Sequence, residues 1–391
     1  MSINDVASAV GVSAGTLRRW AREGVLPEYA GEWNATALAN ARLVARLRQR
    51  GYTLARIRAA TVEGRLAFGR VVELFDRSQS SPLLTFRQAA RRSRLDLDTV
   101  AQVAAALGFV TAEKLDETAL EVLSYVATGL RSGMPAAAML QIVRVYSQAI
   151  AQIADAEVRL VHLYLHEPLM RSGGTPQELA AEIHAVAESL LPLSTQLLER
   201  LHHRLLLEYI EQDVVGHMEA ELPEADDHVG RMLVAIAFVD LAGYTELTDR
   251  EGDLHALEVV ERFLAAVNST LPGDARVVKT IGDEVMIVAA DPTTLASWAI
   301  ELCELLSRTG PSARAAVHYG HVRYRDGDYY GREVNLAARV QAQSREGEVL
   351  VTGSVVNAAE GELRFQPLPD VPLRGFSQST EIYRAYAGWR A

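Results

Sequence analysis

Cysteine and long apolar runs are scarce in this chain of 391 residues. Cys303 is the single cysteine, which excludes an intramolecular disulfide and a cysteine-rich metal site, and its apolar surroundings predict simple packing in a core. No apolar run approaches the ~18–20 residues that span a bilayer. The N-terminus lacks the charged and apolar regions of a signal peptide. We therefore expect a cytoplasmic protein without stable membrane insertion.

Lysine is also nearly absent, since only Lys114 and Lys279 occur among the 39 Lys and Arg residues. Lys279 interrupts the mostly apolar segment 276–281. This segment is followed directly by Gly282 and Asp283. An ammonium group is compact, whereas guanidinium is larger, planar and forked. A lysine in this hairpin therefore suggests a function that arginine would not serve. Chance placement is the alternative that these residues leave open.

The length favours two domains or more, and the charge is divided unevenly between them. Residues 1–110 carry 16 Arg and 9 Asp or Glu, a net charge of +7, so the remainder of a chain with net charge −11 carries −18. The basic part could contact nucleic acid, although surface arginine is also what this composition supplies by default.

The N-terminal segment 3–24 has the pattern of two short helices. Gly11 separates them, Ser13 can cap the second, and Leu17 and Trp20 line its inner face. This pattern resembles the helix-turn-helix module of MerR-type regulators, and we assign residues 1–70 to it. A similar sequence pattern recurs weakly at 86–100. At its start, Thr85 and Gln88 have capping-box spacing.

The pattern stays helical through 71–212, with expected breaks at Pro135, Pro168 and Gly173-Gly174. The amphipathic stretch 198–210 suits a helix that contacts a partner. Residues 213–230 become acidic and lose the apolar period, which predicts a linker.

From residue 231 the pattern changes to alternating strands and helices, which predicts a sheet covered by helices. Strands are expected near 232–241, 275–281, 284–290, 312–321 and 348–352, and helices near 253–270, 293–308 and 332–344.

Three motifs in this last segment carry candidate chemistry. An apolar strand ends at Asp240, and the loop after it opens a helix whose N–H groups can hold phosphate, at Ala242, Gly243, Tyr244 and Thr245. The second motif is the Lys279 hairpin, whose turn Gly282-Asp283 is equally typical of a plain hairpin. In the third, a helix beginning near 332 places Asn335 and Arg339 on one face, where a solvated surface pair is the alternative.

In this order and spacing the three motifs closely resemble the catalytic domain of class III nucleotide cyclases, over about residues 232–391, with Tyr244 where phenylalanine is commoner. The resemblance implies an α+β (ferredoxin-like) catalytic domain at 231–391 behind an all-α regulatory region. It further implies an adenylyl cyclase that makes 3′,5′-cyclic AMP and pyrophosphate from ATP. Asp240 and Asp283 would hold two Mg²⁺ or Mn²⁺ ions.

The same resemblance implies the remaining roles. Lys279 and Asp328 would read adenine, Asn335 would orient the ribose, Arg339 would stabilise charge on the α-phosphate, and Arg374 is a weaker candidate for a triphosphate contact. Each site of a homodimer would take its metal carboxylates from one chain and the other groups from its partner. Monomers are therefore expected to be inactive.

The helical half resembles, in layout, the autoinhibitory region of soluble, pH-responsive actinobacterial adenylyl cyclases. Histidine titrates near neutral pH, so protonation here could switch the enzyme, and ordinary surface histidines are the alternative. Seven of the ten histidines lie in this region: His162, His166, His184, His202, His203, His217 and His228.

A DNA-binding regulator with an appended nucleotide-sensing cyclase-like domain is the rival hypothesis. Its recognition helix would expose Arg18, Arg19 and Arg22. The acidic stretch 28–33 argues against duplex binding, because a MerR-like wing usually offers basic phosphate contacts there.

Overall fold

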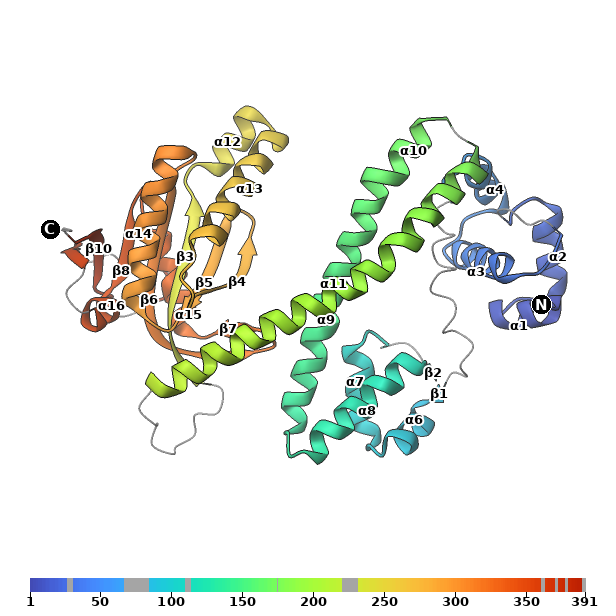
Figure 1. The fold of residues 1–391 in the computed structure, drawn as a ribbon, viewed down its shortest axis with the longest axis horizontal. Helices are drawn as coiled ribbons and strands as arrows, with labels where there is room; N and C mark the ends of the chain where they lie inside the picture. Colours follow the sequence, from blue (N-terminus) through green and yellow to red (C-terminus); the bar gives the residue numbers. More distant parts are fainter. Residues whose placement is uncertain are drawn as a thin grey trace. The chain divides into compact units, whose positions relative to one another are not determined.

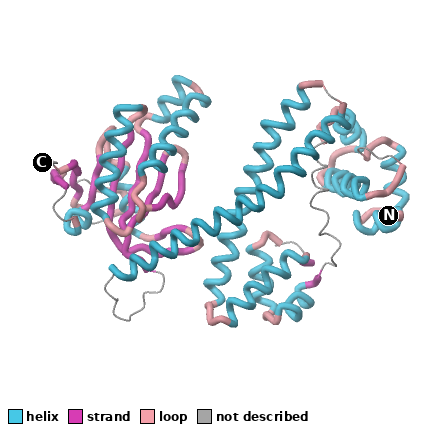
Figure 2. Tube along the Cα trace, viewed as in Figure 1, coloured by secondary structure: helices cyan, strands magenta, loops and turns pink. Residues whose placement is uncertain are grey.

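The computed structural model describes residues 1–26, 31–66, 84–109, 114–173, 175–219, 231–359, 363–369, 372–376 and 379–388. The chain forms two compact units, residues 1–207 and residues 208–391, whose helices and strands are labelled in Figure 1. Figure 2 shows that the first unit is almost wholly helical and that the sheet belongs to the second. Among the described residues, no helix is long and apolar enough to cross a membrane.

The N-terminal helix-turn-helix is confirmed. Gly11 ends the first helix with a left-handed φ of +73°, and the Ser13 hydroxyl accepts from the Thr16 N–H at 3.0 Å. Leu17 and Trp20 are buried in the core of this module. The expected wing segment lies partly outside the described residues, at 27–30. The helices are α1 (Ile3–Val10), α2 (Ala14–Arg22), α3 (Ala35–Gln49) and α4 (Leu54–Val62).

The segment 86–100, whose sequence weakly resembles this module, forms a second helical pair. Thr85 and Gln88 form the expected capping box, in which each side chain bonds the other residue's backbone N–H. The two helices pack in one core with the helix that follows. This part comprises β1 (Leu84–Thr85), α6 (Phe86–Ser93), α7 (Leu97–Ala106), β2 (Lys114–Leu115) and α8 (Glu117–Arg131).

Further helices follow in the first unit: α9 (Ala136–Val161), a π-helical turn η3 (His162–His166), α10 (Glu167–Arg171) and α11 (Pro176–Glu219), whose last residues belong to the second unit. The break expected at Pro168 is wrong, because this proline lies in the first turn of α10, where a missing N–H is tolerated. Helix α11 continues past residue 213, where the acidic linker was expected to begin. The rest of that segment, 220–230, lies outside the described residues.

The second unit is built on one mixed eight-stranded sheet. Its strand order is β4-β5-β3-β6-β8-β10-β9, β7 pairs with β6, and only the β6–β8 pairing is parallel. All five predicted strands, the three predicted helices and the helix expected after the Asp240 loop (α12) are present, and β7, β9, β10 and α16 are additional. The elements are β3 (Arg231–Leu241), α12 (Tyr244–Glu251), α13 (Asp253–Thr270), β4 (Arg276–Ile281), β5 (Glu284–Ala289), α14 (Pro292–Thr309), β6 (Ala313–Arg325), β7 (Asp328–Tyr330), α15 (Arg332–Gln341), β8 (Val349–Thr352), α16 (Gly353–Ala358), β9 (Leu363–Pro367) and β10 (Ile382–Ala387).

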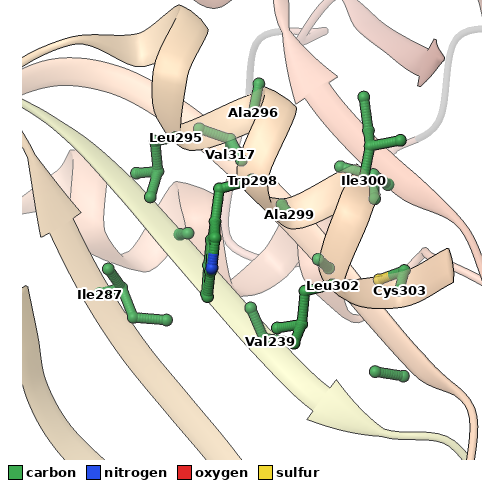
Figure 3. Packing of buried hydrophobic residues seen from close by; sticks show 14 of the residues in the cluster. Val239, Ile287, Leu295, Ala296, Trp298, Ala299, Ile300, Leu302, Cys303 and Val317 are labelled. Atoms are coloured by element: carbon green, nitrogen blue, oxygen red, sulfur yellow. The ribbon is translucent and has the colours of Figure 1, made fainter. Parts of the chain in front are cut away.

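Helices cover both faces of this sheet. The larger core lies under α13 and α14 and includes Phe263. Trp298 and Cys303 belong to the same core and are seen in Figure 3. Burial raises the pKa of the Cys303 thiol to about 12, which confirms its packing role. Helix α15 covers the other face through two smaller cores. Because β3 is buried on both faces, its sequence is a continuous apolar run that places Asp240 at its end.

Candidate active site

The carboxylates of Asp240 and Asp283 lie together at one end of the central strands. Asp240 is the last residue of β3 to face β5, and Asp283 occupies the turn between β4 and β5. Burial and the neighbouring Asp240 carboxylate raise the pKa of Asp283. Burial and the carboxylates of Asp240 and Asp283 also raise the pKa of Glu284. Carboxylates crowded in this way favour a bound cation, and oxygen ligands suit Mg²⁺ and Mn²⁺.

Arg314 holds Asp240 from the adjacent strand. Its Nε and Nη2 atoms donate to Asp240 Oδ2 at 2.9 and 2.6 Å, and the two residues are direct partners across β3 and β6. This contact was not predicted from the sequence. The only signal available there is the presence of a cation, Arg314, in the otherwise apolar segment 313–317.

The loop after β3 turns through Gly243, whose φ of +71° lies in the left-handed region and precedes α12. The Ala242 N–H donates to the Ser312 carbonyl oxygen at 2.8 Å. This amide is therefore not free for phosphate, contrary to the expectation from sequence. The first-turn amides of α12, at Tyr244 and Thr245, have no acceptor within the helix and remain candidates.

Lys279 and Asp328 form a direct ion pair between β4 and β7. Lys279 Nζ donates to Asp328 Oδ2 at 2.5 Å, and the second oxygen, Oδ1, accepts from the Tyr329 N–H at 2.8 Å. Both side chains are partly exposed, at 37% and 24%. The pair thus offers a donor and an acceptor side by side at the surface, which matches the acceptor N1 and the donor N6 of adenine.

A β-bulge in β4 turns Lys279 toward its partner. Val277 is opposite Ile287, whereas Lys279 is opposite Met286, so the register shifts at Val278. Met286 and Val278 belong to the core on the α15 face, and Ile287 and Val277 belong to the core under α13 and α14. Residues two apart in a regular strand share a face, and a bulge changes this relation. Without the bulge, Lys279 would face the opposite side of the sheet.

Asn335 and Arg339 lie one turn apart on the exposed side of α15. The apolar residues Val334, Leu336 and Ala337 of the same helix are buried against the sheet. Arg374 is also exposed, in the segment 372–376. Asn335 and Arg339 thus form a second group of exposed candidate residues, on α15, in addition to the group at positions 240, 279, 283 and 328.

Two protein families match parts of this chain. The adenylate and guanylate cyclase catalytic domain matches residues 230–385, and the MerR helix-turn-helix family of regulatory proteins matches residues 1–61.

Individual relatives extend these matches over most of the chain. A pH-sensitive adenylate cyclase of Mycobacterium tuberculosis, MT1302, is 28% identical over 352 residues, which cover 87% of this chain and 85% of the relative. An adenylate cyclase of Streptomyces coelicolor is 30% identical over 271 residues, 68% of each chain. An adenylate cyclase of Streptomyces griseus is 30% identical over 274 residues, 68% of this chain and 66% of the relative.

Proposed function

Because the chain belongs to the class III nucleotide cyclase family and its relatives include adenylate cyclases, we propose that it converts ATP to 3′,5′-cyclic AMP and pyrophosphate. The observation that carries the choice of ATP is the Lys279–Asp328 ion pair. Adenine presents an acceptor at N1 and a donor at N6, whereas guanine presents the opposite pattern and would leave both side chains mispaired.

Asp240 and Asp283 would hold two Mg²⁺ or Mn²⁺ ions. The raised pKa of Asp283 and the oxygen-only donor set fit such ions. When bound, divalent ions activate the ribose 3′-hydroxyl and stabilise charge on the triphosphate. Arg314 holds Asp240 in place, and the amides of Tyr244 and Thr245 would face the phosphates at the start of α12.

The groups on α15 would complete the site from the partner chain of a homodimer. Asn335 would orient the ribose, and Arg339 would stabilise the charge that develops on the α-phosphate, with Arg374 as a further triphosphate contact. The simplest test of this function is to incubate the purified protein with ATP and Mn²⁺ and to measure cyclic AMP. Absence of product at all protein concentrations would contradict the proposal.

The last turns of α11 offer a route by which the helical region could regulate this site. Within the second unit, Gln212 Nε2 donates to the Gly273 carbonyl oxygen at 2.7 Å. The Arg276 guanidinium lies 5.9 Å from the ring of Tyr209 and 5.5 Å from that of Tyr329. Tyr329 directly follows Asp328, so a shift of α11 would reach the purine-reading pair through a single arginine.

The π-helical turn η3 is our candidate for pH sensitivity. His162 Nδ1 and His166 Nδ1 lie 3.1 Å apart, and the Glu167 carboxylate lies 3.5 Å from His162. His166 is buried, and apolar residues of α10 and α11 pack with Leu165 of this turn. Burial, and then the adjacent His162, lower the pKa of His166. The side chain of His217 and all of His228 lie outside the described residues.

Acid should loosen this turn. The folded protein lowers the pKa of His166 below its ordinary value of 6.5. The stability linked to the neutral ring is therefore fully present above pH 6.5 and is lost as the pH falls from 6.5 through the lowered pKa. We expect the activity of the full chain, divided by that of a shortened chain starting near residue 213, to rise severalfold from about pH 8 to about pH 5.5. His166→Phe should flatten this ratio, as measured by cyclic AMP formation.

His203→Asn, on the exposed side of α11, is the matched control and should keep the wild-type profile. Identical pH profiles of the wild type and His166→Phe would remove η3 as the sensor. A ratio near one at every pH would remove autoinhibition as well.

DNA binding is a second candidate function, favoured by the MerR-type match over residues 1–61. Arg18, Arg19 and Arg22 are exposed on α2, the second helix of the module. If α2 contacts duplex DNA, pooled genomic fragments should shift in electrophoretic mobility at low salt, and Arg18→Ala with Arg22→Ala should weaken the shift at least about tenfold. No shift at low salt would exclude this function.

A further inference from the structure

His318 is a buried polar residue on the sheet face that α15 covers. Its neighbours at alternate positions of β6, Ala316 and Val322, belong to the apolar cores under α15. The His318 side chain is only 5% exposed. A buried imidazole is costly unless both ring nitrogens find partners, so its presence in an apolar layer calls for a specific role.

Both nitrogens of His318 have such partners. Nδ1 lies 2.8 Å from the Thr352 hydroxyl, and Nε2 lies 2.7 Å from Glu333 Oε2. Burial lowers the pKa of His318, although the Glu333 carboxylate opposes this effect. A neutral ring therefore fits the site, with Nε2–H donating to the carboxylate and Nδ1 accepting from Thr352.

Glu333 lies in the first turn of α15, two residues before Asn335 and six before Arg339. Gly331 precedes this helix and provides no side-chain cap. The first backbone N–H groups of a helix are usually bonded by the side chain of the residue that precedes it. In α15 the hydrogen bond between His318 and Glu333 instead fixes the first turn to the sheet.

The absence of a side chain at Gly320 leaves room for the side chains of His318 and Glu333. A Cβ atom at position 320 would lie 2.7 Å from His318 Nε2 and 3.1 Å from Glu333 Cγ. Gly320 is not among the glycines with positive φ, so the requirement here is for space and not for backbone conformation. The sequence thus provides the two polar partners and the glycine that lets them meet.

We propose that His318 and Glu333 are a positioning pair that sets the start of α15 and thereby the placement of Asn335 and Arg339 for catalysis. This inference rests on the proposed cyclase function. Lys279 and Asp328 lie on β4 and β7, so disturbing the pair should change the catalytic step more than nucleotide binding. A displacement of about 1 Å in a positioned group can lower a rate by about 100-fold.

The test compares two amides at position 318 in the full chain. In His318→Gln the amide nitrogen can replace Nε2 and donate to Glu333, whereas the shorter His318→Asn reaches only toward Thr352. We expect His318→Asn to lower kcat by about 10- to 100-fold with little change in KM for ATP, and His318→Gln to stay within about threefold of the wild type. Thermal unfolding of both variants, measured in parallel, should be similar.

Gly320→Ala gives an independent measurement, because it disturbs the pair without removing a hydrogen-bonding group. It should lower kcat, whereas Gly310→Ala, where a Cβ atom meets open space, should not. Equal kcat values for the two amides, or losses that follow thermal stability in all variants, would overturn the positioning role. If the wild type makes no cyclic AMP, the proposed cyclase function is wrong. If the wild type is active and the variants have the same kcat, only the positioning role of His318 and Glu333 is refuted.

Discussion

Replacing Asp240 with alanine is expected to lower the rate of cyclic AMP formation by about 1000-fold, because metal-ion catalysis contributes several kcal/mol and each 1.36 kcal/mol corresponds to a factor of ten. Asp283→Ala should have a similar effect, since the two carboxylates lie together. The measurement is the initial rate with saturating ATP and Mn²⁺. Asp249→Ala, which removes an exposed carboxylate on α12, is the matched control and should keep the wild-type rate.

Mixing variants tests whether the sites are shared between chains. Asp240→Ala mixed with Asn335→Ala should recover about a quarter of the wild-type rate, because half of the randomly formed dimers carry one intact site out of two. Both variants alone should be nearly inactive. A mixture as inactive as its components would place each site within one chain and contradict the proposed dimer.

Changing Lys279 and Asp328, the pair proposed to read the purine, is expected to have the second large effect. Lys279→Glu combined with Asp328→Ser should lower kcat/KM for ATP by about 100-fold or more, because a site built to pair with specific groups strongly disfavours a ligand that leaves them unpaired. The kcat/KM for GTP should change far less. The measurement is product formation from each nucleotide under the same conditions.

The matched control is Lys114→Glu, which changes the other lysine of the chain at an exposed position of the first unit. It should leave both nucleotide rates unchanged. Equal losses with ATP and GTP in the double variant would mean that the pair supports the fold or the catalytic step and does not select the base.

The secondary structure of the second unit was predictable where the pattern is long and uniform. The continuous apolar run of β3 identified that strand, and the turn at Gly282-Asp283 identified the hairpin of β4 and β5. Strands β9 and β10 escaped prediction because they are short and mix polar with apolar residues. Pro168 was misjudged because a proline in a first turn is compatible with a helix.

The candidate residues themselves could be chosen from sequence, because residue type and spacing identify carboxylates, cations and amides. The contacts among them could not. Arg314 reaches Asp240 across strands that are 74 residues apart, and His318 reaches Glu333 between a strand and a helix. Sequence spacing contains no information about which strands become neighbours, since pairing depends on how the whole sheet assembles.

The scarcity of lysine singled out Lys279 from composition alone, because arginine occupies nearly every other cationic position. Its partner was decided only by the tertiary structure. The bulge at Val278 turns the side chain to the α15 face, and the pairing of β7 with β6 brings Asp328 within hydrogen-bonding distance. The chemical character of a side chain is local, whereas its direction and its partner depend on a register that a single inserted residue reverses.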